Sequence, residues 1–354
     1  MKLNLPDSQE LSKVIARLDR TQTHWASQDV LDADRLAELA ATASIESVGA
    51  SCRMAGIHST DAEIASFLEG RSDPPRQGRE LKGYAAALQQ PLPGNDKLLD
   101  AEQIRKLHAV MLGSDGSQPS PWRKQVLFRE GFDATGQSTG HVFTTLPARL
   151  IDEKVEQLLT WLELELRGGD HHPVLVVGNF LLGFLCVSPF ERGNGRIVRL
   201  LAGHLLRRAG YDYVPYASLE SQMEQRRAMY HDALALAQKR IWISESDPTP
   251  WLEYFLHVLE GQRERIESTL ALERPVGEYP PLQRRILEAV REHGNVDAAL
   301  LMQSTGANRN TLKDNLRRLV RGGVLEKTGE RRGTRYQLSS GTRVNPELGG
   351  ALEH

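Results

Sequence analysis

Apolar side chains recur every three to four residues along most of the first 270 positions, and this spacing predicts helices. Capping residues stand where two of these helices should begin, with Thr60 before one and Asp100 before another. The predicted helices cover residues 33–48, 60–69, 78–90, 99–113, 147–166, 173–187, 195–209, 217–239 and 248–268. The body of the chain is therefore predicted to be mainly α.

The segment from Trp122 to Thr145 departs from this pattern. Two apolar runs, 126–128 and 141–144, flank the turn-rich residues 131–140, which predicts a β-hairpin. Because a lone hairpin on a helical body has little sheet to join, we expect it to pack over the helices and cover a ligand.

The helical spacing breaks at a cluster of Pro and Gly between residues 273 and 281, which predicts a domain boundary. Beyond it, three short helices (283–293, 297–304 and 310–321) and two strands (324–327 and 334–338) resemble a winged helix-turn-helix. The predicted parts are an N-terminal helical region 1–115, a core 116–272, a winged helix 273–340 and a tail 341–354 that ends like an affinity tag.

Composition and charge narrow the class of protein. The 354 residues are 40% hydrophobic and 25% charged, which fits a soluble protein of two or three domains and excludes fibrous and disordered classes. The net charge of -2 conceals a basic segment, because residues 281–340 hold 12 Lys and Arg against 6 Asp and Glu. A basic C-terminal domain favours nucleic acid as its partner, and a merely solvated basic face is the alternative.

Two cysteines permit at most one disulfide, and the N-terminus lacks the apolar run of a secretory signal. The longest apolar stretch, residues 173–187, is too short to span a bilayer. We therefore expect a cytoplasmic protein with no membrane partner.

The most informative segment follows that apolar helix and reads S-P-F-E-R-G-N-G-R-I-V-R from Ser188 to Arg199. Pro189 disfavours helix at the residue before it, so the helix should end at Ser188. Gly193 and Gly195 then expose backbone amides at the start of a new helix, where anions bind well.

Arg196 and Arg199 lie one turn apart on the new helix and add positive charge to the same face. The loop is therefore predicted to bind a polyphosphate, and a plain connector between helices is the alternative. It is no Walker loop, since no Lys-Ser/Thr follows, and no Rossmann fingerprint, since no strand precedes it.

The segment resembles the signature H-P-F-x-[DE]-G-N-G-R-x-x-R of the Fic family, and the helices around it resemble the family over roughly residues 35–270. The resemblance implies a helical bundle with a hairpin flap that uses ATP and Mg²⁺. It implies transfer of AMP from ATP to a Ser, Thr or Tyr hydroxyl of a target protein or of the chain itself. Residue 188 takes the catalytic position, with Asn194 on the transferring phosphate.

The resemblance also implies the remaining site residues. Gly193 and Gly195 present amides, while Arg196 and Arg199 hold the β and γ phosphates. Tyr230 lines the nucleoside pocket. The flap residues that align a target strand by β-augmentation are Val142, Phe143, Thr144 and Thr145.

Two positions depart from the signature. Ser188 replaces the family histidine, and a hydroxyl cannot act as a general base near neutral pH, so the rate should fall by about 10²- to 10⁴-fold. Arg192 stands where the family has its metal-binding acid, with Glu191 one residue early. Either Glu191 substitutes as the Mg²⁺ ligand, or Arg192 contacts phosphate itself.

A third resemblance concerns the inhibitory helix of many Fic proteins, [ST]-x-x-x-E-[GN], whose Glu pairs with the second motif arginine. Ser51 to Gly56 resembles it, with Ala55 in place of the Glu. Residues 42–46 fit less well. The interpretation favoured is that Ala55 leaves Arg199 free, so that ATP binds unobstructed; a simple packing helix is the alternative.

The winged helix would contact DNA through its recognition helix and wing, and its alternative use is to form a homodimer. The candidate DNA-binding residues are Arg309, Asn310, Thr311, Lys313, Arg331 and Arg332. Two functions compete with AMP transfer: a non-catalytic, nucleotide-sensing DNA-binding regulator, and a Fic-fold enzyme that removes AMP.

Overall fold

The computed structural model describes residues 9–27, 31, 33–73, 78–92, 98–132, 138–168, 170–238, 247–273, 279–329 and 334–339. Contacts within the chain divide it into two compact units: one comprises Met1–Ser27 and Asp34–Gln262, and the other Gln28–Ala33 and Arg263–His354. The division lies within a long helix, α11 (Thr249–Glu273). Among the helices described, none combines the length and apolarity that a bilayer-crossing segment needs.

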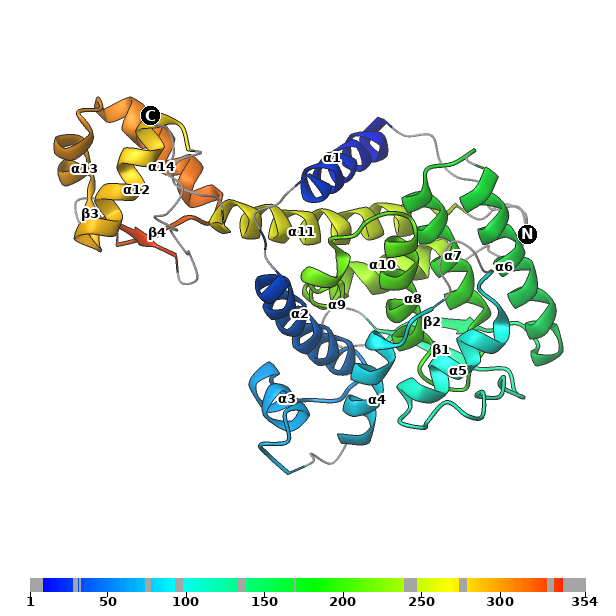
Figure 1. Cartoon of the computed structure of the whole chain (residues 1–354). Helices are drawn as coiled ribbons and strands as arrows, with labels where there is room; N and C mark the ends of the chain where they lie inside the picture. The colour runs from blue at the N-terminus through cyan, green and yellow to red at the C-terminus, as the bar shows by residue number, and fades with distance from the viewer. Residues whose placement is uncertain are drawn as a thin grey trace. The chain divides into compact units, whose positions relative to one another are not determined.

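The larger unit is mainly helical, as predicted (Figure 1). Besides the first half of α11 it contains α1 (Gln9–Ala26), α2 (Ala33–Arg53), α3 (Asp61–Leu68), α4 (Gly78–Gln89), α5 (Ala101–Met111), α6 (Ile151–Gly168), α7 (Pro173–Val187), α8 (Asn194–Arg208), α9 (Leu219–Gln225) and α10 (Arg227–Gln238). Two short 3₁₀ turns, η1 (Ala148–Leu150) and η2 (Val214–Tyr216), join some of them. Helix α7 is buried along almost its whole length and packs against α6 and α8. The loop that follows α7 therefore starts within the core.

The predicted helix starts at Thr60 and Asp100 are confirmed as capping boxes. The Thr60 hydroxyl accepts a hydrogen bond from the Glu63 amide, and the Glu63 carboxylate accepts one from the Thr60 amide. Asp100 and Gln103 make the same exchange. Each box satisfies amides that the first turn of a helix leaves unpaired.

Three helix predictions need correction. Helix α1 was not predicted, and α2 continues to Arg53, past Gly49. Glycine fits at position 49, whereas a Cβ atom there would lie 2.2 Å from the Asp61 carboxylate of α3 and clash with it. The single helix predicted over 217–239 is broken at Arg226 into α9 and α10. The break carries no Gly or Pro, and it lies where Gly261 of α11 approaches the Arg226 side chain.

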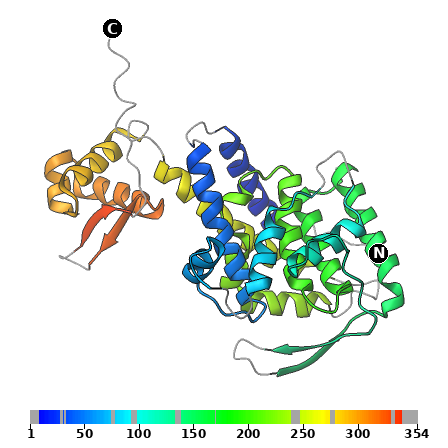
Figure 2. The same cartoon turned by 60° about the horizontal axis from the view of Figure 1, so that its bottom comes forward.

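The predicted hairpin is present and consists of β1 (Phe128–Phe132) and β2 (Ser138–Thr144). Phe128 pairs with Thr144, and the register shifts between Glu130 and Phe132. The strands reach further toward the tip than predicted, because edge strands tolerate Gly131 and Gly140 that we assigned to the turn. Figure 2 shows this hairpin, here called the flap, projecting from the helical unit. Residues 133–137 lie outside the described residues.

The smaller unit contains α12 (Pro281–His293), α13 (Ala298–Thr305) and α14 (Arg309–Arg321), with strands β3 (Val296–Asp297), β4 (Leu325–Thr328) and β5 (Arg335–Leu338). The strands form an antiparallel sheet in the order β3-β5-β4. The unit has a core of its own, in which Ile286, Leu301, Leu312 and Leu316 are buried. The three helices and the strands β4 and β5 agree with the sequence prediction. Strand β3 was not predicted, because at two residues it is too short to show an alternating pattern.

Candidate functional site

The predicted phosphate loop begins where α7 ends. Ser188 adopts a left-handed backbone, with φ 43° and ψ 65°, and is the only described non-glycine residue with positive φ. Its hydroxyl donates to the Leu185 carbonyl at 2.5 Å, and its amide donates to the Phe184 carbonyl at 2.9 Å. Ser188 therefore ends α7 and turns the chain into the loop, as the following proline predicted.

Asn194 closes the loop across four residues. Its Oδ1 accepts from the Phe190 amide at 3.0 Å, and its Nδ2 donates to the Phe190 carbonyl at 2.7 Å. Gly193 caps α8 with φ 80°, and a Cβ atom there would lie 2.9 Å from the Met111 Cε. The oxygen and the nitrogen of the Asn194 carboxamide thus both hydrogen-bond within the loop. The sequence interpretation had assigned this side chain to a phosphate.

His108 of α5 packs against the loop and was missed by sequence reasoning. Its ring stacks on Phe190 with centroids 3.6 Å apart. Nε2 lies 3.0 Å from the Arg192 carbonyl, so it carries the proton, and Nδ1 accepts from the Ser120 hydroxyl at 2.8 Å. Burial lowers the pKa of His108 to about 4, so the ring is neutral at physiological pH.

Arg123, also missed, ties the loop to the base of the flap. Its Nε donates to the Ser188 carbonyl at 2.8 Å and one Nη to the Leu146 carbonyl at 2.8 Å. Its backbone amide donates to the Pro189 carbonyl at 2.8 Å. The residue is 2% exposed, so one buried guanidinium joins the end of α7 to the chain that leaves β2.

Arg196 is buried on the first turn of α8 and forms an ion pair with Glu80 of α4. The other oxygen of the same carboxylate lies 3.7 Å from a guanidinium nitrogen of Arg192. Among the described residues, the Arg196 Nε has no hydrogen-bond partner. Glu80 was not among the predicted site residues, because nothing in the sequence near it signals that it meets the loop.

Arg199 is not free, contrary to the prediction. Its Nε donates to the Ser51 hydroxyl at 2.8 Å, and one Nη donates to the Ser51 carbonyl at 2.9 Å. Ser51 also hydrogen-bonds Tyr84, whose hydroxyl donates to Glu220 at 3.0 Å. Burial and the Glu220 carboxylate raise the pKa of Tyr84 well above its usual value. The Tyr84 hydroxyl therefore keeps its proton and can donate a hydrogen bond to Glu220.

The predicted regulatory segment divides at the end of α2. Ser51 is buried against Arg199, whereas Ala55 and Gly56 lie exposed in the turn beyond the helix. The prediction assumed that residue 55 would face Arg199 and that its lack of a carboxylate would free the arginine. The helix instead ends at Arg53, so the backbone and hydroxyl of Ser51 meet Arg199.

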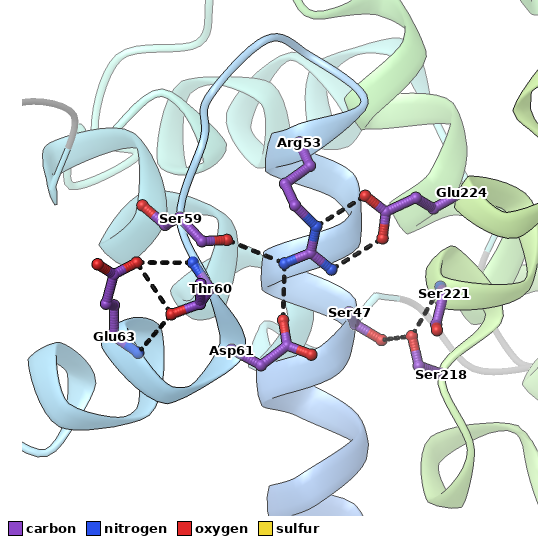
Figure 3. Close-up of polar contacts among 9 residues, drawn as sticks. All are labelled: Ser47, Arg53, Ser59, Thr60, Asp61, Glu63, Ser218, Ser221 and Glu224. Carbon is purple, nitrogen blue, oxygen red and sulfur yellow. Dashed lines mark hydrogen bonds and ion pairs between the residues drawn. The ribbon is translucent and has the colours of Figure 1, made fainter.

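Arg53 anchors this end of α2 (Figure 3). Its guanidinium donates to both Glu224 oxygens of α9, at 2.7 and 2.8 Å, and to Asp61 of α3 at 2.7 Å. Nearby, the Ser47 hydroxyl donates to that of Ser218 at 2.9 Å. The two carboxylates raise the pKa of Arg53 above its usual value. These contacts fix the position at which Ser51 meets Arg199.

Tyr230 of α10 lies close to the loop. A Cβ atom on Gly195 would lie 4.0 Å from the Tyr230 hydroxyl and 3.4 Å from an Arg199 nitrogen. Edge-on contacts with Trp251 and Tyr254, each at 5.7 Å between centroids, hold the ring. Burial raises the pKa of Tyr230.

The residues present do not fit the Mg²⁺ ion that the resemblance implies. Glu191 is exposed, and the adjacent position carries the Arg192 guanidinium, which cannot ligate a cation. No group of three or more His, Cys, Asp or Glu side chains suited to a metal occurs in the described part of the chain.

The remaining predicted residues belong to the flap and to the smaller unit. Val142 and Phe143 belong to β2, though their side chains lie outside the described part, and Thr144 is exposed at its end. The buried Thr145 hydroxyl accepts from the Leu127 amide at 2.9 Å. In the smaller unit, the exposed residues at the start of α14 are Arg309, Asn310, Thr311 and Lys313. Arg331 and Arg332 lie outside the described residues.

Comparison with known protein families gives one match, in which residues 98–206 fit the Fic/DOC family. This segment is similar to a Fic/DOC domain. It contains the flap, the end of α7, the loop and most of α8. Proteins with a Fic/DOC domain generally transfer a nucleoside monophosphate to a target.

Solved structures agree with the Fic fold. A Fic family protein from Desulfovibrio desulfuricans G20 is 20% identical with a TM-score of 0.61, covering 97% of this chain and 100% of that one. A Fic domain containing signaling protein from Bacteroides thetaiotaomicron VPI-5482 is 20% identical with a TM-score of 0.55, covering 74% and 94%. Fic-1 (residues 134–508) from C. elegans is 18% identical with a TM-score of 0.60, covering 75% and 74%. A comparison with curated proteins finds no match.

Proposed function

We propose that this chain is a Fic-type adenylyltransferase that binds ATP and transfers AMP to a Ser, Thr or Tyr hydroxyl of a target protein or of itself. The observation that carries the proposal is the start of α8. There Arg196 and Arg199 lie one turn apart, both buried, behind a loop whose glycines leave backbone amides at the helix N-terminus. Guanidinium groups and helix-terminal amides together favour a polyphosphate.

Each motif residue has a role in this proposal. The amides of Gly193 and Gly195 receive the α-phosphate oxygens, and Asn194 holds the loop in shape through Phe190. Arg196 and Arg199 receive the β and γ phosphates after giving up Glu80 and Ser51. Tyr230 lines the nucleoside end, and the edge of β2 opposite β1 aligns the target strand.

The chain as it stands is a slow enzyme. A hydroxyl at position 188 cannot take a proton from the attacking target hydroxyl near neutral pH. The left-handed backbone of Ser188 and its bond to Leu185 turn its hydroxyl to the end of α7. No step is assigned to a metal, because the donor set does not fit one.

Calorimetric titration of the whole chain with ATP tests the binding half of the proposal. We expect micromolar binding that Arg196→Ala abolishes, because a buried charge-assisted phosphate contact is lost. Arg207→Ala is the matched control, since Arg207 is an exposed arginine further along α8. Equal binding by both variants would remove Arg196 from the site, and no binding by any form would make the loop a connector.

The transfer half needs the general base restored. Ser188→His should raise incorporation of labelled AMP into protein by about 10²- to 10⁴-fold, the usual contribution of a general base. ATP binding without transfer in this variant would favour the nucleotide-sensing regulator. Release of AMP from a modified protein, without transfer, would favour the reverse reaction.

We propose a second function for the smaller unit, as a winged helix-turn-helix that binds DNA. Its specific support is the arrangement of three helices with a three-stranded sheet in the order β3-β5-β4, in which β3 lies between α12 and α13 and the β4–β5 pair follows α14. The exposed face of α14 is also basic. In such modules the third helix enters the major groove and the wing contacts phosphates.

A further inference from the structure

Two arginines of the loop converge on one carboxylate. Glu80 reaches from the first turn of α4 and places one oxygen against Arg196 and the other 3.7 Å from Arg192. Residues 80 and 196 are 116 positions apart, so the meeting is a product of the fold and not of local sequence. The carboxylate marks a point that both guanidinium groups reach at once.

The charges at this point favour an anion over a cation. Arg192 and Arg196 carry two positive charges against the single negative charge of Glu80. A terminal phosphate carries more charge than a carboxylate and offers three oxygens to the same donors. The arginine at 192 therefore supplies, from the protein itself, the positive charge that a metal would otherwise bring to the phosphate.

The contacts are also of a kind that a ligand can replace. The Glu80 side chain is 24% exposed and that of Arg192 is 68% exposed, so both reorient without opening the core. Arg196 is held in place by burial at 6% exposure, and its Nε has no partner in the described structure. A buried arginine, an exposed arginine and a partly exposed acid together make a site at which an added anion can replace the carboxylate.

We propose that Arg192 and Arg196 form a metal-independent subsite for a terminal phosphate, which Glu80 occupies until a phosphate displaces it. This inference rests on the proposed nucleotide binding and deepens it: it names Glu80 as the competitor and removes the need for Mg²⁺. The ligand class is an inorganic or nucleotide polyphosphate.

Inorganic pyrophosphate is the probe, because it reports on the subsite without the nucleoside. The whole chain is titrated calorimetrically in EDTA and again with excess Mg²⁺. Glu80→Gln should bind pyrophosphate about tenfold more tightly than wild type, because the competing charge is removed. Arg192→Ala should bind about tenfold more weakly, and Mg²⁺ should improve neither value.

Glu102→Gln is the matched control, since Glu102 of α5 also pairs with a basic side chain, Lys106 at 2.6 Å, away from the loop. The inference is overturned if Glu80→Gln binds no more tightly than Glu102→Gln, or if pyrophosphate binds only with Mg²⁺. It is also overturned if no form binds pyrophosphate. Should Glu80→Gln fold poorly, the Arg192→Ala variant still tests the inference, because the Arg192 side chain is exposed and its removal leaves the core unchanged.

The outcome separates this inference from the proposed enzyme. Tighter pyrophosphate binding by Glu80→Gln, without AMP transfer by Ser188→His, would leave the subsite standing and remove the adenylyltransferase. AMP transfer by Ser188→His, with Glu80→Gln indistinguishable from its control, would keep the enzyme and remove the role of Glu80.

Discussion

At the scale of single residues, the loop is held by side chains that use their hydrogen-bonding groups on each other. Asn194 uses both ends of its carboxamide on Phe190, and His108 uses both ring nitrogens between Ser120 and the Arg192 carbonyl. Such paired groups fix a loop geometry before any ligand arrives, which lowers the cost of ordering it on binding.

His108 makes the stability of the larger unit depend on pH. An unfolded histidine takes up a proton near pH 6.5, whereas burial delays uptake by folded His108 to about pH 4. Between these values the unfolded state binds more protons, so the free energy of unfolding falls as the pH falls. From pH 7 to pH 5 this residue should account for a loss of about 2 kcal/mol.

The His108→Gln variant tests this, because glutamine still offers a donor to the Arg192 carbonyl but takes up no proton. Denaturant unfolding at pH 7 and pH 5 should show a loss of stability smaller than that of wild type by about 2 kcal/mol. The exposed His58 provides the control His58→Gln, which should lose as much stability as wild type. Equal losses in wild type and His108→Gln would contradict the expectation.

Residue by residue, the sequence predicted only part of the candidate site. The loop residues were found because glycines, a proline and arginines lie within twelve positions. Glu80 and His108 could not be found, since each meets the loop through packing of helices distant in sequence. The expectation that Arg199 is free was wrong, because spacing alone cannot show which residue of α2 faces it.

At the scale of elements, the flap and α7 are joined by Arg123. The guanidinium donates to carbonyls at the end of α7 and to carbonyls on both sides of the flap, those of Gln125 and Leu146. One side chain therefore holds the base of the flap and the backbone of Ser188 together.

Replacing Arg123 should loosen both elements together. Arg123→Met leaves several buried carbonyls without a donor, which should cost about 3 kcal/mol or more. Hydrogen exchange should quicken in β1, in β2 and at the amides of Ser188 and Phe190, while α12–α14 stay unchanged. Arg149→Met, a change at an arginine outside this network, serves as the control. Faster exchange in the flap alone would show that Arg123 does not couple it to the loop.

Element predictions succeeded where periodicity and caps agreed, as at Thr60 and Asp100. They failed where tertiary packing decided the boundary. The chain breaks between α9 and α10 beside Gly261 of α11, and α2 runs through Gly49 against Asp61. Neither contact leaves a local signal, because the partner lies elsewhere in the chain.

At the scale of the whole molecule, the chain combines a segment that matches the Fic/DOC family with a small basic unit that has its own core. Residues 281–340 carry a net charge of +6, from 12 basic and 6 acidic residues, whereas the whole chain carries -2. This division of charge follows directly from the amino-acid composition. It could not predict β3, which completes the sheet by pairing Val296 with Tyr336.

The exposed face of α14 should carry the affinity for DNA. Lys313 and Arg317 lie four residues apart on that face, so both can reach phosphates beside one groove. The double variant Lys313→Glu and Arg317→Glu should weaken binding of the whole chain to duplex DNA at every sequence. The plot of log affinity against log salt should also lose about two units of slope, one per phosphate contact.

Fluorescence anisotropy with labelled duplexes at several salt concentrations measures both quantities. The matched control, Lys13→Glu with Lys106→Glu, changes two lysines on helices of the larger unit and should leave the slope unchanged. If the α14 variant keeps the wild-type slope, the face is not a DNA contact. If wild type shows no salt-dependent binding, the basic charge of this unit serves only to solvate its surface.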